Sequence, residues 1–229
     1  LDAPFNIEYY EPNNPETEAT YMGCRTRVMS NICGKNEVSG RGNLSFTTIN
    51  LPRLGIEHGI VKNDKANLDG FFKDLDDKIE LVIDQLLERM EIQGNKKVKN
   101  FPFLMGQGIW RDSDKLNYED RLEEVIKQGT LTLGFIGLAE CLIALTGKHH
   151  GESEESQELG LKIISHMRKR MDEATDKYKL NFSLIATPAE GLSGRFTSID
   201  KGIYGELKGI TDKEYYTNSF HIPVYYKIS

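Results

Sequence analysis

The stretch "GTLTLGFIGLAECLIALTG", residues 129–147, decides the fold class. Its first part, 131–135, is a short apolar run, which predicts a buried β-strand. After Gly137 the apolar residues continue, and we expect the chain to pass from strand to helix there. Cys141 lies within this run, so we expect its thiol to be a small core residue. A strand that leads directly into a helix is typical of α/β proteins.

The segments on either side of this stretch extend the same pattern. Helices are predicted at 67–90 and 154–178, and buried strands at 43–52 and 181–187. The predicted inward stripes are Phe72, Leu75, Ile79, Val82, Leu86 and Met90 in the first helix, and Ile164, Met167, Met171, Ala174 and Tyr178 in the second. A short helix is predicted at 120–127. Strands that alternate with long helices predict an α/β fold with parallel strands buried between helices.

Length, charge and cysteine content exclude several classes of protein. The 229 residues carry a net charge of -6, which gives no reason to expect nucleic acid or an anionic membrane as a partner. No apolar run reaches the roughly 18 residues of a membrane span, and no signal peptide is evident, so we expect a cytoplasmic protein. Three scattered cysteines form no CxxC pair and predict reduced thiols. Because the chain starts at Leu1 rather than Met, we interpret it as a fragment.

The segment "ATPAEGLSGRF", 186–196, has two interpretations. A strand that ends in a glycine-rich and hydroxyl-rich turn can direct backbone N–H groups and a helix N-terminus at a phosphate. The carboxylate of Glu190 would repel that phosphate unless it points away. Alternatively, the segment is an ordinary strand-to-helix turn with Thr187 or Ser193 as the N-cap. Spacing alone favours the ordinary turn and leaves the phosphate site open.

The histidines give little reason to expect a metal site. His149 and His150 are adjacent in "GKHHGES", where their side chains would point apart, and no second pair has metal-ligand spacing. We expect a polar loop there, leading to a helix that is capped by Ser153. The isolated His58, His166 and His221 are expected to be structural or at the surface.

Cys24, in "YMGCRT" at 21–26, differs from the other cysteines in its surroundings. It follows a glycine and precedes an arginine, where an exposed thiol of low pKa is plausible. Composition alone narrowly favours a packed structural thiol. The residues alone therefore leave the role of Cys24 open.

Five strings together resemble the anaerobic (class III) ribonucleoside-triphosphate reductases, in the same order and over nearly the whole chain. These strings are "YMGCRTRVMSN", "GRGNLSFTTINLPRLGIE", "GTLTLGFIGLAECLIALTGKHHGES", "LNFSLIATPAEGLSGRF" and "YYTNSFHIPV". The resemblance implies an α/β fold that is the later half of the ten-stranded barrel of ribonucleotide reductases and glycyl radical enzymes. Residues 1–229 would then be a single fragment of the catalytic barrel domain.

The resemblance also implies roles for particular residues. Cys24 matches the thiyl-radical cysteine at the tip of a finger loop inside the barrel, and Met22 and Thr26 flank it in the substrate pocket. Asn43 matches the pocket asparagine on the adjoining strand. The turn that would hold the substrate phosphates comprises Thr187, Ala189, Glu190, Gly191, Leu192 and Ser193. Together these residues would hold a ribose over a hydrogen-abstracting sulfur.

The resemblance also implies that several sites of the full-length enzyme lie outside this chain. The structural zinc and the glycyl radical would follow Ser229, so no metal ligands are expected here, and the sites for ATP and dNTP effectors would precede Leu1. The implied partners are a ribonucleoside triphosphate, a radical-SAM activase and a second copy of the full-length enzyme. We expect the fragment alone to be inactive. The alternative is a non-catalytic α/β module that binds a nucleotide or phosphate, and Cys24 would discriminate between the two.

Overall fold

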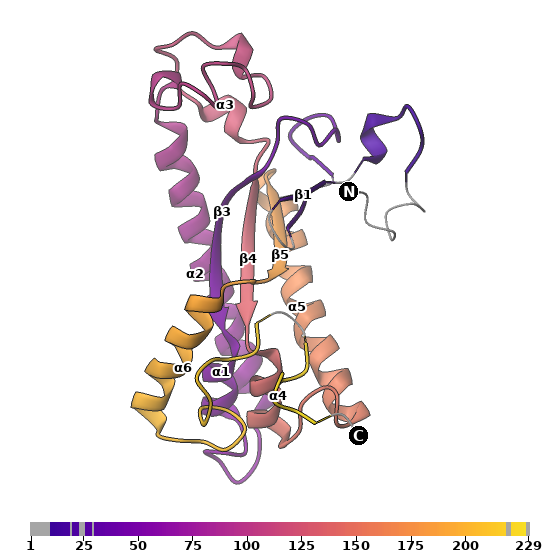
Figure 1. Ribbon diagram of the computed structural model, residues 1–229, viewed down its shortest axis with the longest axis vertical. Coiled ribbons are helices and arrows are strands. Elements are labelled where there is room, and N and C mark those ends of the chain that lie inside the picture. The colour runs from indigo at the N-terminus through magenta and orange to yellow at the C-terminus, as the bar shows by residue number, and fades with distance from the viewer. Residues whose placement is uncertain (1–9, 19, 23–25, 29, 219–220, 228–229) are drawn as a thin grey trace. The chain divides into compact units, whose positions relative to one another are not determined.

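The computed structural model describes residues 10–18, 20–22, 26–28, 30–218 and 221–227 (Figure 1). The chain divides into two compact units, one formed by 1–47, 83–132 and 171–183, the other by 48–82, 133–170 and 184–229. In chain order the elements are the 3-10 turn η2 (Pro15–Thr17), β1 (Thr20–Met22), β2 (Thr26–Val28), β3 (Asn43–Asn50), α1 (Leu51–His58), α2 (Leu68–Gly94), the 3-10 turns η3 (Val98–Asn100) and η4 (Ser113–Lys115), α3 (Glu123–Ile126), β4 (Thr130–Ile136), α4 (Leu138–Thr146), α5 (Glu154–Tyr178), β5 (Asn181–Ala186) and α6 (Glu190–Tyr204).

A three-stranded parallel sheet in the order β3-β4-β5 forms the centre of the fold (Figure 1). All seven residues of the middle strand β4 are buried. A strand covered on both faces needs apolar residues at consecutive positions, and the run at 131–135 has them. The predicted α/β class is confirmed, as are the predicted strands near 131 and 181 and the passage into α4 after Gly137.

Helix α1 is an element that the sequence analysis missed. The strand predicted at 43–52 ends at Asn50, and the helix begins at the next residue. The Asn50 side chain accepts a hydrogen bond from the backbone N–H of Arg53 at 3.4 Å, and Pro52 lies in the first turn. Both features favour a helix start, because asparagine caps an exposed N–H group and proline has none to satisfy.

Helices α1 and α4 pack closely against each other. A Cβ atom at Gly59, just after α1, would lie 2.0 Å from the carbonyl oxygen of Ala144 in α4, so only glycine fits there. Cys141 of α4 is fully buried beside Gly55, and burial raises the pKa of its thiol. The predicted core role of Cys141 is confirmed.

The two long predicted helices are confirmed as α2 and α5. Most of their predicted inward residues are buried, namely Leu75, Ile79, Val82, Leu86, Met167, Met171 and Ala174, and the first position of each stripe differs. Phe71 rather than Phe72 is fully buried in α2, and Ile163 rather than Ile164 in α5. Successive helix positions lie about 100° apart, so the neighbour of a core residue sits at the edge of the buried stripe. No helix in the described part of the chain is both long and apolar enough to cross a membrane.

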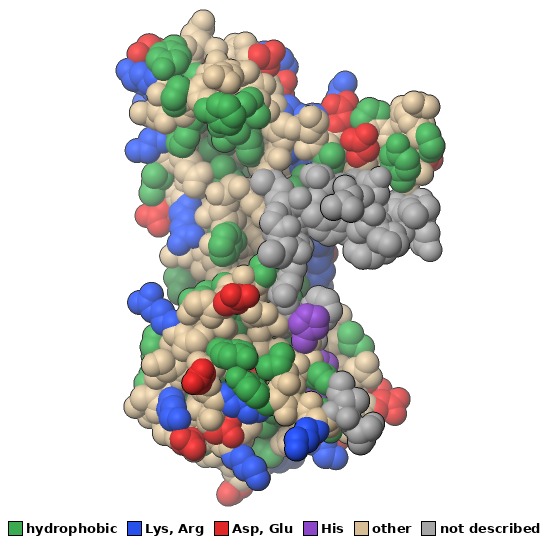
Figure 2. Space-filling model, viewed as in Figure 1, with side chains coloured by type: hydrophobic (Ala, Val, Ile, Leu, Met, Phe, Trp, Pro, Cys, Tyr) green, Lys and Arg blue, Asp and Glu red, His purple; other side chains and the backbone are tan. Residues whose placement is uncertain are grey.

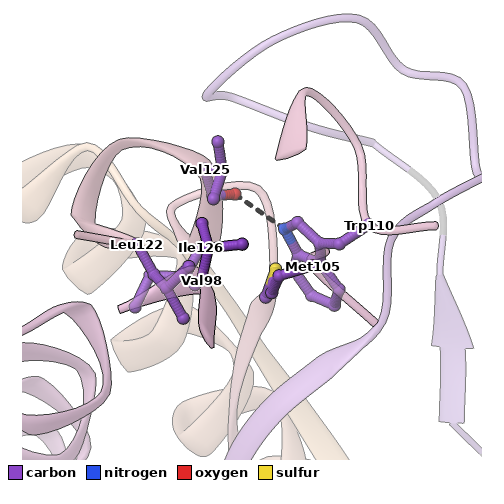
Figure 3. Close-up of a cluster of buried hydrophobic side chains, with 6 residues drawn as sticks. All are labelled: Val98, Met105, Trp110, Leu122, Val125 and Ile126. Carbon is purple, nitrogen blue, oxygen red and sulfur yellow. Dashed lines mark hydrogen bonds between the residues drawn. The ribbon is translucent and has the colours of Figure 1, made fainter. Parts of the chain in front are cut away.

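The segment between α2 and β4 is mostly irregular and has a small core of its own (Figure 3). Trp110 is buried at its centre, and its indole N–H donates to the carbonyl oxygen of Val125 at 2.8 Å. The helix predicted at 120–127 is only the short α3. Hydrophobic side chains also lie on the surface of this segment (Figure 2), and Phe103 and Ile109 are exposed.

Candidate functional site

Strands β1 and β2 form an antiparallel hairpin in which Met22 pairs with Thr26. Two further pairs, Thr20 with Val28 and Tyr21 with Arg27, fix the register. The structure therefore brings together the backbones of the two residues predicted to flank the reactive cysteine. Cys24 itself lies outside the described residues.

Asn43, the predicted pocket asparagine, is the first residue of β3 and is half-buried. Its side-chain oxygen Oδ1 is buried and accepts no hydrogen bond from the described residues. A buried acceptor without a partner costs about 1–3 kcal/mol, so native proteins rarely leave one unsatisfied without a reason. The amide of Asn43 is therefore a candidate contact for a ligand.

The predicted phosphate turn joins β5 to α6. The backbone N–H of Thr187 donates to the carbonyl oxygen of Phe135 in β4 at 3.0 Å, and its hydroxyl pairs with that of Thr48 in β3 at 3.0 Å. Ala189 is the residue before the first turn of α6, and no side chain caps that helix. The turn is thus anchored to two strands, while the helix start that follows it carries no side-chain cap.

Neither residue that the sequence offered as N-cap of this helix has that role. The Ser193 hydroxyl donates to the carbonyl oxygen of Glu190 at 2.7 Å, inside the first turn. Thr187 uses its hydroxyl on Thr48, because β5 ends before it and directs it toward the neighbouring strands. The capping prediction for Thr187 and Ser193 was therefore wrong, and the first N–H groups of α6 keep no side-chain partner.

An uncapped helix N-terminus is suited to holding an anion. Its free N–H groups and the partial positive charge of the helix both favour negative charge at that end. Gly191 has open space around it, since an added Cβ there would meet no atom within 4 Å. Glu190 is exposed, so its carboxylate can remain in solvent. This turn can accept a phosphate group without displacing a side-chain cap.

A glycine in β4 makes room for the pair of threonine hydroxyls. A Cβ atom at Gly134 would lie 2.1 Å from the hydroxyl oxygen of Thr187 and 2.7 Å from that of Thr48. Any other residue at this position would push the two hydroxyls apart. Strands β3 and β4 thus contribute Thr48 and Gly134 to fix Thr187, the first residue after β5.

Helix α6 buries a polar stripe along one face. Ser193, Thr197 and Asp200 are the buried residues of this helix, and their spacing of four and three places them on one side. The Thr197 hydroxyl donates to the carbonyl oxygen of Ser193, while the Asp200 carboxylate accepts four hydrogen bonds from other segments. Burial, followed by the charge of Asp200, raises the pKa of its partner Tyr216.

A second buried carboxylate, Glu140, lies in the first turn of α4. One oxygen accepts hydrogen bonds from the backbone N–H and the hydroxyl of Thr217, at 3.0 and 2.6 Å. The other oxygen is buried and has no hydrogen-bond partner among the described residues. Desolvation raises the pKa of Glu140, because water can no longer stabilise its charge.

His58, His149 and His166 make hydrogen bonds to neighbouring groups. The predicted Ser153 cap is confirmed, since its hydroxyl accepts from the backbone N–H of Ser156 at 3.3 Å. The predicted loop between α4 and α5 is confirmed, but the His149 side chain is buried in it; its Nδ1 accepts from the N–H of Gly151, and burial lowers its pKa. His166 makes a 2.8 Å hydrogen bond to Asp76. No three His, Cys, Asp or Glu side chains of the described residues are grouped so as to hold a metal ion.

Several residues around the turn were not found from the sequence. They are Thr48, Asn50, Gly134, Asp200 and Tyr216. The sequence "INLPR" did contain one available signal, an asparagine two residues before a proline, which is typical of a helix start. Asp200 gave no such signal, because an acidic residue in an amphipathic helix is usually exposed.

The sequence is similar to known proteins along nearly its whole length. The family model for the anaerobic ribonucleoside-triphosphate reductase matches residues 3–229. The reductase of Escherichia coli K12 is 35% identical over 215 residues, which are 92% of this chain and 29% of that protein. The reductase of Enterobacteria phage T4 is 32% identical over 207 residues, 89% of this chain and 32% of that protein.

Solved structures agree on the fold. The anaerobic ribonucleotide reductase from Thermotoga maritima with citrate in the active site matches 84% of this chain and 31% of its own, with a TM-score of 0.58 at 18% identity. Its complex with dATP and CTP matches 79% of this chain and 27% of its own, with a TM-score of 0.57 at 19% identity. This chain therefore spans about 30% of its full-length relatives, and it belongs to the anaerobic ribonucleoside-triphosphate reductase family.

Proposed function

We propose that this chain is the later half of the catalytic barrel of an enzyme that reduces ribonucleoside triphosphates to deoxyribonucleoside triphosphates under anaerobic conditions. The observation that carries the proposal is the uncapped start of α6, directly after a turn that is anchored to two parallel strands. Ligands of parallel α/β folds bind at the carboxyl ends of the strands, where this turn lies. Family membership supplies the chemical context.

The turn would hold the substrate through its triphosphate. Backbone N–H groups at Glu190, Gly191 and Leu192 would donate to phosphate oxygens, and the helix end would favour their negative charge. Thr187, Ala189 and Ser193 would keep the backbone in the required conformation. Fixing the phosphates also fixes the sugar, because binding a remote part of a substrate orients its reacting centre.

Cys24 would act on the ribose. The backbone pairing of Met22 with Thr26 supports this role, since it leaves only three residues to connect the hairpin strands around Cys24. As a thiyl radical, the sulfur would take the hydrogen atom from ribose carbon 3', forming an S–H bond and leaving the unpaired electron on that carbon. A glycyl radical of the full-length enzyme would supply the radical to the sulfur.

Asn43 would contact the sugar. Its buried Oδ1 has no hydrogen-bond partner among the described residues and could accept a hydrogen bond from a ribose hydroxyl. The radical-SAM activase, the effector nucleotides and a second subunit would act on other parts of the full-length enzyme. Members of the family have been solved with dATP and CTP, which supports nucleotide binding as the general function.

The test is the variant Cys24→Ala in the full-length enzyme. Ribonucleotide reduction should fall to background, while the Kd for the ribonucleoside triphosphate stays within about twofold, because no contact to the phosphates is lost. Cys33→Ala, at a half-buried thiol that donates to the carbonyl oxygen of Lys179, is the matched control and should keep activity. Retained turnover in Cys24→Ala would contradict the proposal and favour a nucleotide-binding module without radical chemistry.

A further inference from the structure

We propose that Asp200 is a positioning residue for the substrate phosphates, a role that rests on the proposed function of the turn before α6. Asp200 lies ten residues after Glu190, which is about 15 Å along a helix, so it does not touch the phosphates itself. It would act through the helix, by fixing the place where the first turn of α6 presents its N–H groups.

Four hydrogen bonds hold the Asp200 carboxylate. One oxygen accepts from Nε and Nη2 of Arg53 at 2.7 and 2.5 Å. The other accepts from the side-chain amide of Asn50 at 2.7 Å and from the hydroxyl of Tyr216 at 2.8 Å. The donors come from the end of β3, from α1 and from the segment after α6, so three separate segments converge on one side chain.

Because Asp200 is buried, its hydrogen bonds define the position of α6 as well as stabilising it. The Asp200 side chain is fully buried, whereas Arg53 is 38% exposed at its side chain. A buried carboxylate must have its hydrogen bonds satisfied, and a shift of α6 would stretch or break some of these four. Apolar contacts tolerate sliding, but directional bonds to a buried charge do not. The register of α6 against β3 and α1 is therefore set at Asp200.

The same strand also fixes the beginning of the turn. Thr48 pairs with Thr187, and Asn50 donates to Asp200; residues two apart in a strand face the same side of the sheet. Strand β3 thus contacts Thr187, before the amides proposed to bind phosphate, and Asp200, after them. A shift of α6 would move those amides relative to the anchored Thr187.

The experiment measures phosphate-dependent binding in the full-length enzyme. In Asp200→Asn, the Kd and KM for a ribonucleoside triphosphate should rise about tenfold, because Arg53 loses its charged partner and the helix can shift. The Kd for the corresponding ribonucleoside, which has no phosphate, should stay within about twofold. The kcat at saturating substrate should also change little, since Asp200 touches no reacting atom.

Matched variants separate positioning from loss of stability. Asp76 of α2 pairs with His166 and accepts from Arg170, both in α5. Asp76→Asn should therefore lower the melting temperature without changing the ratio of the triphosphate Kd to the nucleoside Kd. If Asp200→Asn does not fold, Tyr216→Phe and Arg53→Lys remove parts of the network and should each raise that ratio about threefold. An unchanged ratio in the folded variants would overturn the inference, whereas a wild-type enzyme with equal Kd values for the two ligands would overturn the proposed phosphate site itself.

Discussion

Helices α5 and α6 differ in the kind of side chain that they bury completely. Helix α5 buries Ile163, Met167, Met171 and Ala174, an apolar stripe of the kind that a hydrophobic core requires. Helix α6 buries Ser193, Thr197 and Asp200, and leaves Ile199 and Ile203 exposed. Apolar burial supplies stability without much directional preference, while hydrogen bonds define an orientation. Leu192, Phe196 and Tyr204 of α6 also pack against a hydrophobic cluster, but the fully buried side chains of this helix are polar and make directional bonds.

The largest expected effect concerns the apolar side of this comparison. Met167 of α5 is fully buried, so Met167→Ala should lower the free energy of unfolding by about 3 kcal/mol through lost burial and a residual cavity. Thermal and urea unfolding would measure it. Met167→Leu, which keeps the volume, should cost less than about 1.5 kcal/mol. Similar losses in both variants would mean that α5 also depends on specific geometry.

Next in size is the change Gly134→Ala in β4. The added methyl group would overlap the hydroxyl oxygen of Thr187, and we expect a loss of about 2 kcal/mol from overpacking. Because the overlap is with that hydroxyl, Thr187→Ala in the same chain should restore part of the loss. Unfolding measurements on both single variants and the double variant form a cycle. Simple additivity of the two changes would refute the proposed clearance role of Gly134.

A smaller effect depends on pH and on Glu140. Its pKa is raised in the folded state by desolvation, so its contribution to stability is present below the pKa of the unfolded state and is lost as pH rises through the folded pKa. Glu140→Gln cannot ionise and should be more stable than wild type at pH 8 by about 1 kcal/mol. Melting curves from pH 4 to 8 test this. A difference that does not grow with pH would contradict it.

The smallest effect is expected for Thr197→Val. The two side chains have similar shapes, and the change removes only the hydrogen bond from the Thr197 hydroxyl to the carbonyl oxygen of Ser193. Such a bond contributes about 0.5 kcal/mol net. Unfolding experiments would compare the variant with Ser198→Ala, an exposed change on the same helix. A loss above that of Met167→Ala would reverse the ranking of the two stripes.

Periodicity predicted the elements whose faces are apolar. The bounds of α5 match the predicted 154–178. Strand β4 and helix α4 lie on either side of Gly137, where the passage from strand to helix was predicted. The buried faces of α2 and α5 result from the hydrophobic effect, so the spacing of apolar residues along the sequence is enough to predict them. For these elements the local pattern carries enough information.

The polar contacts of the candidate site could not be predicted in the same way. Asp200 and Arg53 are 147 residues apart, and nothing local marks either of them as a partner. The turn at 187–193 was recognised by its composition and by its resemblance to a family, but its capping was predicted wrongly because Thr48, across the sheet, takes the Thr187 hydroxyl. Hydrogen bonds between distant segments depend on the assembled fold.

The double use of Asn50 has a consequence for which substitutions this position tolerates. Its amide oxygen starts α1, and its amide nitrogen donates to the Asp200 carboxylate. Aspartate caps helices as well as asparagine does, yet here it would set a second carboxylate against a buried one. Mutation or deamidation of Asn50 to aspartate would therefore place two carboxylates side by side and push α1 and α6 apart.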